Sequence, residues 1–154
     1  MSDTADFWRE AMRHGMGNTA FLRALGGEIV AFEVGRGRMR LPYSQKLVGN
    51  PDTGVVHGGV IAGMLDQACG MAIGSALRAP AAIATLDLRI DYMKPAEPGI
   101  DLLIESQCLK IAHEIAFARA YAFHESKEDP IAIATGTFML TQGAAFATRA
   151  AEKP

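Results

Sequence analysis

The longest apolar run of the chain covers residues 58–77 and predicts a single helix. Nearly every side of this helix would be apolar or small, and at about 1.5 Å per residue it would extend roughly 30 Å. A helix that is hydrophobic all round has to be enclosed by the rest of the protein. Asp66 near its centre would oppose membrane insertion by roughly 2.5–3.5 kcal/mol, so a helix buried in a protein core is expected, with no membrane partner.

The remaining sequence shows strand-like alternation, which predicts the strands that would enclose this helix. Residues 28–41 alternate arginines with apolar or glycine positions, and four further strand-like segments follow the helix. The turns between them are too short for parallel crossovers, which predicts antiparallel pairing. The four segments are residues 82–93, 100–110, 113–124 and 131–141, and in 113–124 every second residue from 116 to 122 is alanine, which gives one face of small side chains. The predicted fold is α+β, with one long central helix wrapped by a curved antiparallel sheet of about five strands.

The two ends predict peripheral structure around one domain, residues 1–154. Residues 3–14 and 18–25 favour short helices, with Asn18 as N-cap and the glycines at 26 and 27 as the stop, so residues 1–26 are expected to be peripheral. Residues 142–154 are expected to form a loose tail. No repeat or linker divides the sequence.

Composition narrows the classes of function. The net charge is −2 with the basic residues scattered, so no nucleic-acid partner is expected. The N-terminal residues lack a secretory signal, which predicts a cytoplasmic location. Cys69 and Cys108 have no metal-ligand spacing, and we predict neither a metal site nor a disulfide.

Three short motifs resemble the hot-dog-fold acyl-CoA thioesterases, in particular the phenylacetate-pathway type within the 4-hydroxybenzoyl-CoA thioesterase-like superfamily. The likeness covers residues 47–140 and implies hydrolysis of acyl-CoA to free acid and coenzyme A, with no cofactor besides the coenzyme A of the substrate. The motifs are Val56-His57-Gly58-Gly59, Leu65-Asp66, and the stretch from Thr85 to Ala96 with Gly99 after it.

Physical chemistry gives the two central residues of this resemblance plausible roles. The amide of Gly58 would stand at the positive end of the helix, where it can polarise a thioester carbonyl. In the family, the carboxylate matching Asp66 attacks that carbonyl or takes a proton from the attacking water. The alternatives are a glycine that only permits a tight turn and an acid that is hydrogen-bonded at a dimer seam.

Gly58 and Asp66 are eight residues apart, or about 12 Å along one helix. One chain therefore cannot present both to one carbon, whereas two antiparallel helices related by a two-fold axis can. We predict an obligate homodimer with shared active sites, which could pair further into a dimer of dimers.

The resemblance suggests further catalytic residues. Thr85 matches a Ser or Thr that holds the attacking water, but strict alternation places it on the face of Asp87, so a bulge or a sheet edge would be needed. Asn50 matches an amide that donates to the thioester or orders the loop, although it precedes His57 by seven residues where the family has six. His57 itself is expected to brace the loop.

Substrate contacts are predicted at Gly59 in the turn, at Met64 in an acyl pocket, and at the basic residues Arg89 and Lys94. Further candidates for the coenzyme A phosphates are Arg36, Arg38, Lys110 and His113.

Two rival functions remain open at this point. Asp52 and His57 have the Asp-x-x-x-x-His spacing of hot-dog enoyl-CoA hydratases and dehydratases, which use an acid–base pair. A non-catalytic acyl-CoA-binding protein is the other.

Overall fold

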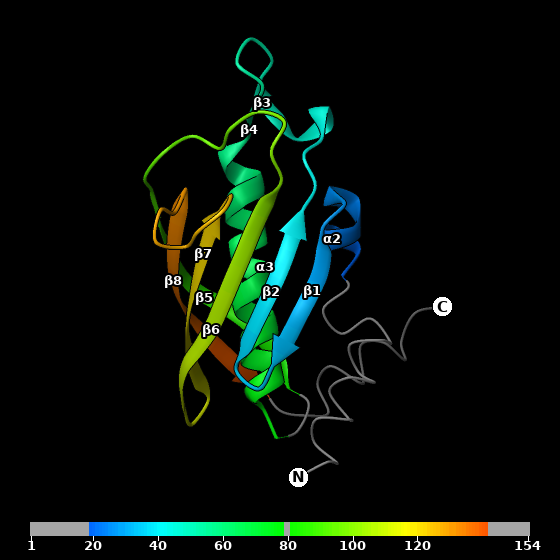
Figure 1. Cartoon of the computed structure of the whole chain (residues 1–154). Helices are drawn as coiled ribbons and strands as arrows, with labels where there is room; N and C mark the ends of the chain where they lie inside the picture. The colour runs from blue at the N-terminus through cyan, green and yellow to red at the C-terminus, as the bar shows by residue number, and fades with distance from the viewer. Residues whose placement is uncertain (1–18, 79–80, 142–154) are drawn as a thin grey trace, which may run out of the picture.

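The structure is a computed structural model that describes residues 19–78 and 81–141, and the predicted helix at 3–14 and tail at 142–154 lie outside these ranges. One long helix is wrapped by a curved sheet (Figure 1). The helices are α2 (Ala20–Leu25) and α3 (Gly58–Ala76), with a short 3₁₀ turn, η1 (Gln45–Leu47). The strands are β1 (Glu28–Glu33), β2 (Arg36–Leu41), β3 (Val48–Asn50), β4 (Val55–Val56), β5 (Ala82–Tyr92), β6 (Leu102–Ala112), β7 (Ile115–Phe123) and β8 (Ala132–Thr141).

The main sheet has the order β1-β2-β6-β7-β8-β5, and every neighbouring pair is antiparallel. This confirms the predicted architecture. The sheet has six strands instead of about five because residues 28–41 form a hairpin and not one strand. Gly35 in its turn has a φ of 74°, a left-handed conformation that glycine adopts without steric cost.

The apolar helix α3 occupies the centre of the core, as its sequence pattern predicts. The alanine face of β7 is buried and lies against α3, because small side chains let the helix approach the sheet closely. Leu65 on the helix and Phe138 on β8 are also fully buried. In the described part of the chain, no helix is both long and apolar enough to span a membrane.

The short helix α2 begins one residue later than predicted. Its N-cap is Thr19, whose Oγ1 accepts a hydrogen bond from the Leu22 amide at 3.1 Å, whereas Asn18 lies outside the described residues. Thr and Asn both suit this position, so the sequence pattern alone left the choice uncertain. The helix ends as predicted at Gly26, which is left-handed with a φ of 79°.

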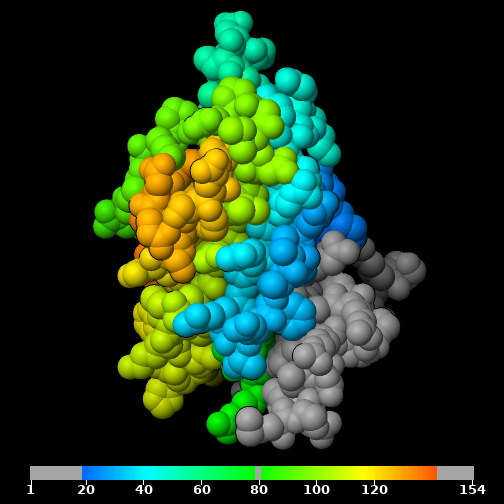
Figure 2. All heavy atoms as spheres, viewed as in Figure 1, coloured from blue at the N-terminus to red at the C-terminus, as the bar shows by residue number. Residues whose placement is uncertain are grey.

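The loop that leads into α3 has its own structure. β3 and β4 form a small antiparallel hairpin, separate from the main sheet. It projects at the end of the molecule where α3 begins, as both the ribbon and the space-filling view show (Figures 1 and 2). The hairpin therefore places the residues before Gly58 outside the main sheet.

Candidate active site

The helix α3 begins at Gly58, as predicted, and His57 is its N-cap. The His57 imidazole Nδ1 accepts a hydrogen bond from the Gly59 amide at 2.9 Å, and the His57 amide donates to the Leu47 carbonyl at 2.8 Å. Within the described residues, nothing accepts a hydrogen bond from the Gly58 amide. A free N–H donor therefore stands at the positive end of the helix dipole.

Tyr92, at the end of β5, holds the other side of this turn. Its hydroxyl donates a hydrogen bond to the Gly58 carbonyl at 2.7 Å. Burial raises the pKa of Tyr92, so the hydroxyl keeps its proton at neutral pH. Tyr92 lies within the stretch that carries the family resemblance, but no role is predicted for it, because nothing local in the sequence shows that it reaches a residue 34 positions away.

A hollow of 360 Å³ opens beside Gly58 and is walled by the chain after β5. Lys94, a predicted substrate-binding residue, lies in this wall and forms an ion pair with Asp129. The residues lining the hollow are Val55, Val56, Gly58, Ile61, Tyr92, Met93, Lys94, Pro95 and Ala96.

Asp66 is half-buried in the middle of α3 and accepts a hydrogen bond from the Thr85 hydroxyl at 2.7 Å. The sequence required a bulge or a sheet edge for this contact, and the structure has both. The pairing of β5 with β8 shifts register between Thr85 and Asp87, and β5 is the last strand of the sheet. The bulge at Leu86 inserts one extra residue into β5. Thr85 can therefore face the helix, although the residues after the bulge still alternate between the two faces of the sheet.

Cys69, one helical turn after Asp66, is not a nucleophile candidate. Burial raises the pKa of the Cys69 thiol to about 12, and the nearby Asp66 carboxylate contributes to the rise. Because the thiolate is the reactive form of cysteine, this buried thiol is inert at neutral pH.

The free Gly58 amide and Asp66 both lie on α3 but are about 12 Å apart along its axis. One chain does not bring them to the same point.

Comparison with known proteins identifies the family. The sequence model of the thioesterase superfamily matches residues 53–131. The medium/long-chain acyl-CoA thioesterase YigI of Escherichia coli is 33% identical, with the match covering 78% of this chain and 84% of YigI. The chain belongs to the thioesterase superfamily. A Halobacterium salinarum protein whose name describes it as an esterase is 36% identical, over 63% of this chain and 65% of its own length.

Solved structures agree with this assignment. A thioesterase family protein from Silicibacter pomeroyi has a TM-score of 0.78 at 25% identity, covering 88% of this chain and 99% of that one. A Pseudomonas aeruginosa protein has a TM-score of 0.70 at 37% identity, covering 89% and 96%. PaaI from the phenylacetic acid degradation operon of E. coli shares the fold, with a TM-score of 0.69 at 19% identity over 90% and 99%. The predicted hot-dog thioesterase family is confirmed, and with it the expectation of an enzyme of the thioester hydrolase class.

The structure shows one side-chain contact of Asn50, a predicted catalytic residue, among the described residues. This residue ends β3, and its side-chain oxygen accepts a hydrogen bond from the Asp52 amide at 3.0 Å, so Asn50 orders the hairpin turn. The Asp52 and His57 side chains share no hydrogen bond in the described chain, and the Nδ1 of His57 is occupied by Gly59. This geometry does not favour the acid–base pair of the hydratase alternative.

Two other predicted substrate-binding residues are placed away from the hollow. Met64 is completely buried in the described chain, and its side chain lies near Gly27 in the core. Methionine is flexible and fills irregular core space well, which explains this position. Arg89 lies on β5 with its side chain 76% exposed and pairs with Asp91.

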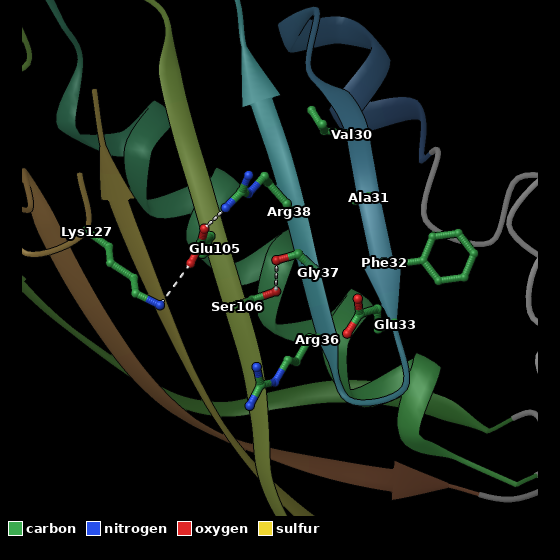
Figure 3. A pocket seen from close by; sticks show the side chains of 10 residues that line it. All are labelled: Val30, Ala31, Phe32, Glu33, Arg36, Gly37, Arg38, Glu105, Ser106 and Lys127. Atoms are coloured by element: carbon green, nitrogen blue, oxygen red, sulfur yellow. Dashed lines mark hydrogen bonds and ion pairs between the residues drawn. The ribbon is translucent and has the colours of Figure 1, made fainter. Parts of the chain in front are cut away.

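A second hollow, of 470 Å³, lies over β1, β2 and β6 and contains two of the candidate phosphate-binding arginines (Figure 3). Arg38 is already paired with Glu105, which also contacts Lys127 at 3.3 Å. No described residue forms a hydrogen bond or ion pair with the Arg36 side chain. This hollow shares no residue with the one beside Gly58.

Proposed function

We propose that this chain hydrolyses acyl-CoA thioesters to a free acid and coenzyme A, which enters only as part of the substrate. The observation that carries the proposal is the pair of an unoccupied Gly58 amide at the start of α3 and an Asp66 carboxylate oriented by Thr85. The name of the relative YigI, an acyl-CoA thioesterase, supports the substrate class.

The chemistry follows from what each group offers. The thioester carbonyl oxygen accepts a hydrogen bond from the Gly58 amide, which stabilises the negative charge that develops as the carbonyl carbon becomes tetrahedral. Asp66 either attacks that carbon or removes a proton from the attacking water. The carbon–sulfur bond then breaks, and the thiolate of coenzyme A leaves and takes up a proton. If water attacks, this step releases the free acid. If Asp66 attacks, the acyl group stays on its carboxylate as an anhydride, and water then cleaves the anhydride to release the acid and restore Asp66. Thr85 keeps one carboxylate oxygen directed, and Lys94 lines the hollow beside Gly58. Gly59, next to Gly58 in the same turn, is proposed as a further substrate contact.

A homodimer with shared sites is part of the proposal, because Gly58 and Asp66 of one chain are too far apart to act together. The open edge of β5 supports it, since no described strand pairs with that edge and long unpaired edges favour pairing with another chain. A two-fold axis beside β5 would pair two β5 strands and set the two α3 helices antiparallel. Asp66 is hydrogen-bonded to this same edge strand, so it lies on the side that the second copy would cover.

The first experiment measures thiol release from a panel of acyl-CoAs by the wild-type protein and by Asp66→Asn. We expect the variant to lose roughly a hundredfold or more in kcat while keeping its melting temperature, because the amide is nearly isosteric but is neither a base nor a nucleophile. Crotonyl-CoA is included in the panel. Hydration of crotonyl-CoA without thiol release would favour the hydratase, and binding without any turnover would favour the non-catalytic protein.

The second experiment tests sharing of the sites by mixing two inactive variants. Gly58→Pro removes the N–H while remaining compatible with the first turn of a helix, and the His57 backbone, with a φ of −59° and a ψ of 132°, suits a following proline. Gly58→Ala is the matched control, since its Cβ would lie 3.6 Å from the Tyr92 ring, an ordinary contact.

In a mixed dimer of Asp66→Asn and Gly58→Pro, one site receives an intact Gly58 from one chain and an intact Asp66 from the other. Shared sites therefore predict recovery of activity on mixing under conditions in which subunits exchange, with the fraction of mixed dimer measured by mass spectrometry. Mixed dimers that form without regaining activity would show that each chain builds its own site.

A further inference from the structure

Three loops meet beyond the end of the main sheet, and two of them border the hollow beside Gly58. One is the hairpin β3–β4, which leads directly into Gly58. The second is the chain after β5, residues 93–100, which forms the opposite wall. The third joins β2 to η1 and carries Tyr43.

Tyr43 ties the hairpin to the body of the protein. Its hydroxyl donates a hydrogen bond to the Gly54 carbonyl at 2.7 Å. Gly54 has a φ of 73°, and a Cβ there would lie 3.2 Å from both the Tyr43 hydroxyl and Pro98, so the three loops pack closely at this glycine. Gly54 precedes β4, and β4 is followed at once by His57 and Gly58.

His124, just after β7, forms the hydrogen bonds that hold the opposite wall of the hollow. Its Nε2 accepts a hydrogen bond from the Glu97 amide at 2.8 Å, so the ring proton is on Nδ1, which donates to the Asp101 carbonyl at 2.9 Å. Glu97 follows Ala96, which lines the hollow.

Asp101 forms hydrogen bonds with both Tyr43 and His124. Its Oδ1 accepts a hydrogen bond from the Tyr43 amide at 2.8 Å, its Oδ2 accepts from the Arg40 guanidinium at 2.6 Å and 3.0 Å, and its carbonyl accepts from His124. One residue, anchored to β2 by Arg40, thus connects to the hairpin through Tyr43 and to the wall through His124.

We propose that Asp101, Tyr43 and His124 are positioning residues that hold the two sides of the Gly58 site at a fixed separation. The inference rests on the proposed function. The Tyr43 branch sets the Gly58 amide, whose effect on a developing negative charge depends on placement within a few tenths of an ångström. The His124 branch sets the wall that contacts the bound substrate. The two branches therefore govern different kinetic constants.

The test of the Tyr43 branch is Tyr43→Phe, with Tyr121→Phe as matched control, because no described residue hydrogen-bonds to the Tyr121 hydroxyl. Tyr43→Phe keeps the ring and the backbone bond to Asp101. It loses the bond to Gly54, together with the longer 3.5 Å bond that the exposed Gln45 side chain donates to the hydroxyl. We expect kcat to fall about fivefold, the usual effect of losing one hydrogen bond, with KM unchanged. A kcat within about twofold of the wild type would overturn this branch.

The test of the His124 branch compares two amides. His124→Gln can place an acceptor near the position of Nε2 and so keep the bond to Glu97, whereas His124→Asn can replace only the Nδ1 donor to Asp101. We expect KM to rise about fivefold in His124→Asn and to be largely restored in His124→Gln, with kcat changed little in both. Equal KM values for both variants and the wild type would overturn this branch.

Hydrogen exchange of the free protein separates failure of this inference from failure of the proposed function. In Tyr43→Phe, the hydrogen-bonded amides of His57 and Gly59 should exchange about fivefold faster than in the wild type or Tyr121→Phe. A wild-type protein without thiol release would refute the proposed function while exchange still tests the network. Unchanged exchange in an active enzyme would refute the network alone.

Discussion

The two halves of the proposed site are held by different parts of the fold. Asp66 sits half-buried in the middle of the core helix α3, and the one hydrogen bond that the described residues make to its carboxylate comes from Thr85 on the edge strand β5. The Gly58 amide stands at the start of the same helix, in a turn that is held by His57 through the Gly59 amide, by Tyr92 through the Gly58 carbonyl, and by the preceding β3–β4 hairpin. Asp66 is positioned by the core, whereas the Gly58 amide is positioned by loops. We therefore expect substitutions near the two groups to lower kcat by different amounts.

Among substitutions of the residues that hold the two groups, the largest effect is expected from Thr85→Val, which removes the only hydrogen bond that the described residues make to the Asp66 carboxylate. Valine has the shape of threonine and suits a strand, so stability should change little. The carboxylate loses its orientation, and we expect kcat to fall about tenfold, as for a hydrogen bond to a charged group. Thiol-release kinetics measure this, and Thr85→Ser, which keeps the hydroxyl, should retain most of the rate. Equal rates for the valine and serine variants would mean that the bond does not orient the acid.

A smaller effect is expected on the donor side from Tyr92→Phe. The hydroxyl donates to the Gly58 carbonyl, so its loss loosens the first turn of α3 without touching the N–H that binds the substrate. Because His57 and the hairpin still hold the turn, we expect kcat to fall only about threefold to fivefold. Steady-state kinetics with the acyl-CoA that the wild type prefers give the comparison. If Tyr92→Phe lowered kcat more than Thr85→Val does, the expected order of the two sides would be reversed, and the loops around Gly58 would matter more than the contact that orients Asp66.

The same contrast explains which features could be predicted from the sequence. The bounds of α3 were predicted almost to the residue, because its apolar run is continuous and the glycines before it mark its start. Strict alternation along β5 conflicted with the expected role of Thr85, and that conflict correctly required the bulge found at Leu86. Features governed by local periodicity could therefore be predicted from the sequence.

The loop side was largely hidden from the sequence. Tyr92, Tyr43 and His124 each act through hydrogen bonds to residues between 11 and 34 positions away. No periodicity records such contacts, since they depend on how loops meet after the sheet has formed. Met64, which is expected in an acyl pocket, is completely buried in the described chain, and its contact with substrate remains a prediction. The roles assigned to Asn50, His57 and Gly59 remain predictions that kinetics must test.

The smallest expected effect concerns stability at acid pH and involves Asp101 on the loop side. The Tyr43 amide, and to a smaller extent the Arg40 guanidinium, lower the pKa of Asp101 below its ordinary value. A group whose pKa is lower in the folded state stabilises the protein above the unfolded pKa of about 4, and this stabilisation is lost as the pH falls through the folded pKa.

Melting temperatures of the wild type and Asp101→Asn should accordingly differ most near neutral pH and converge as the pH falls below about 4. Asp52→Asn is the control, since no described residue forms a hydrogen bond or ion pair with the Asp52 carboxylate, and its difference from the wild type should stay small throughout. Because Asp101 is partly exposed to solvent, the convergence should amount to only a few degrees. A difference for Asp101→Asn that is constant with pH would show that the carboxylate acts through its shape alone and not through its charge.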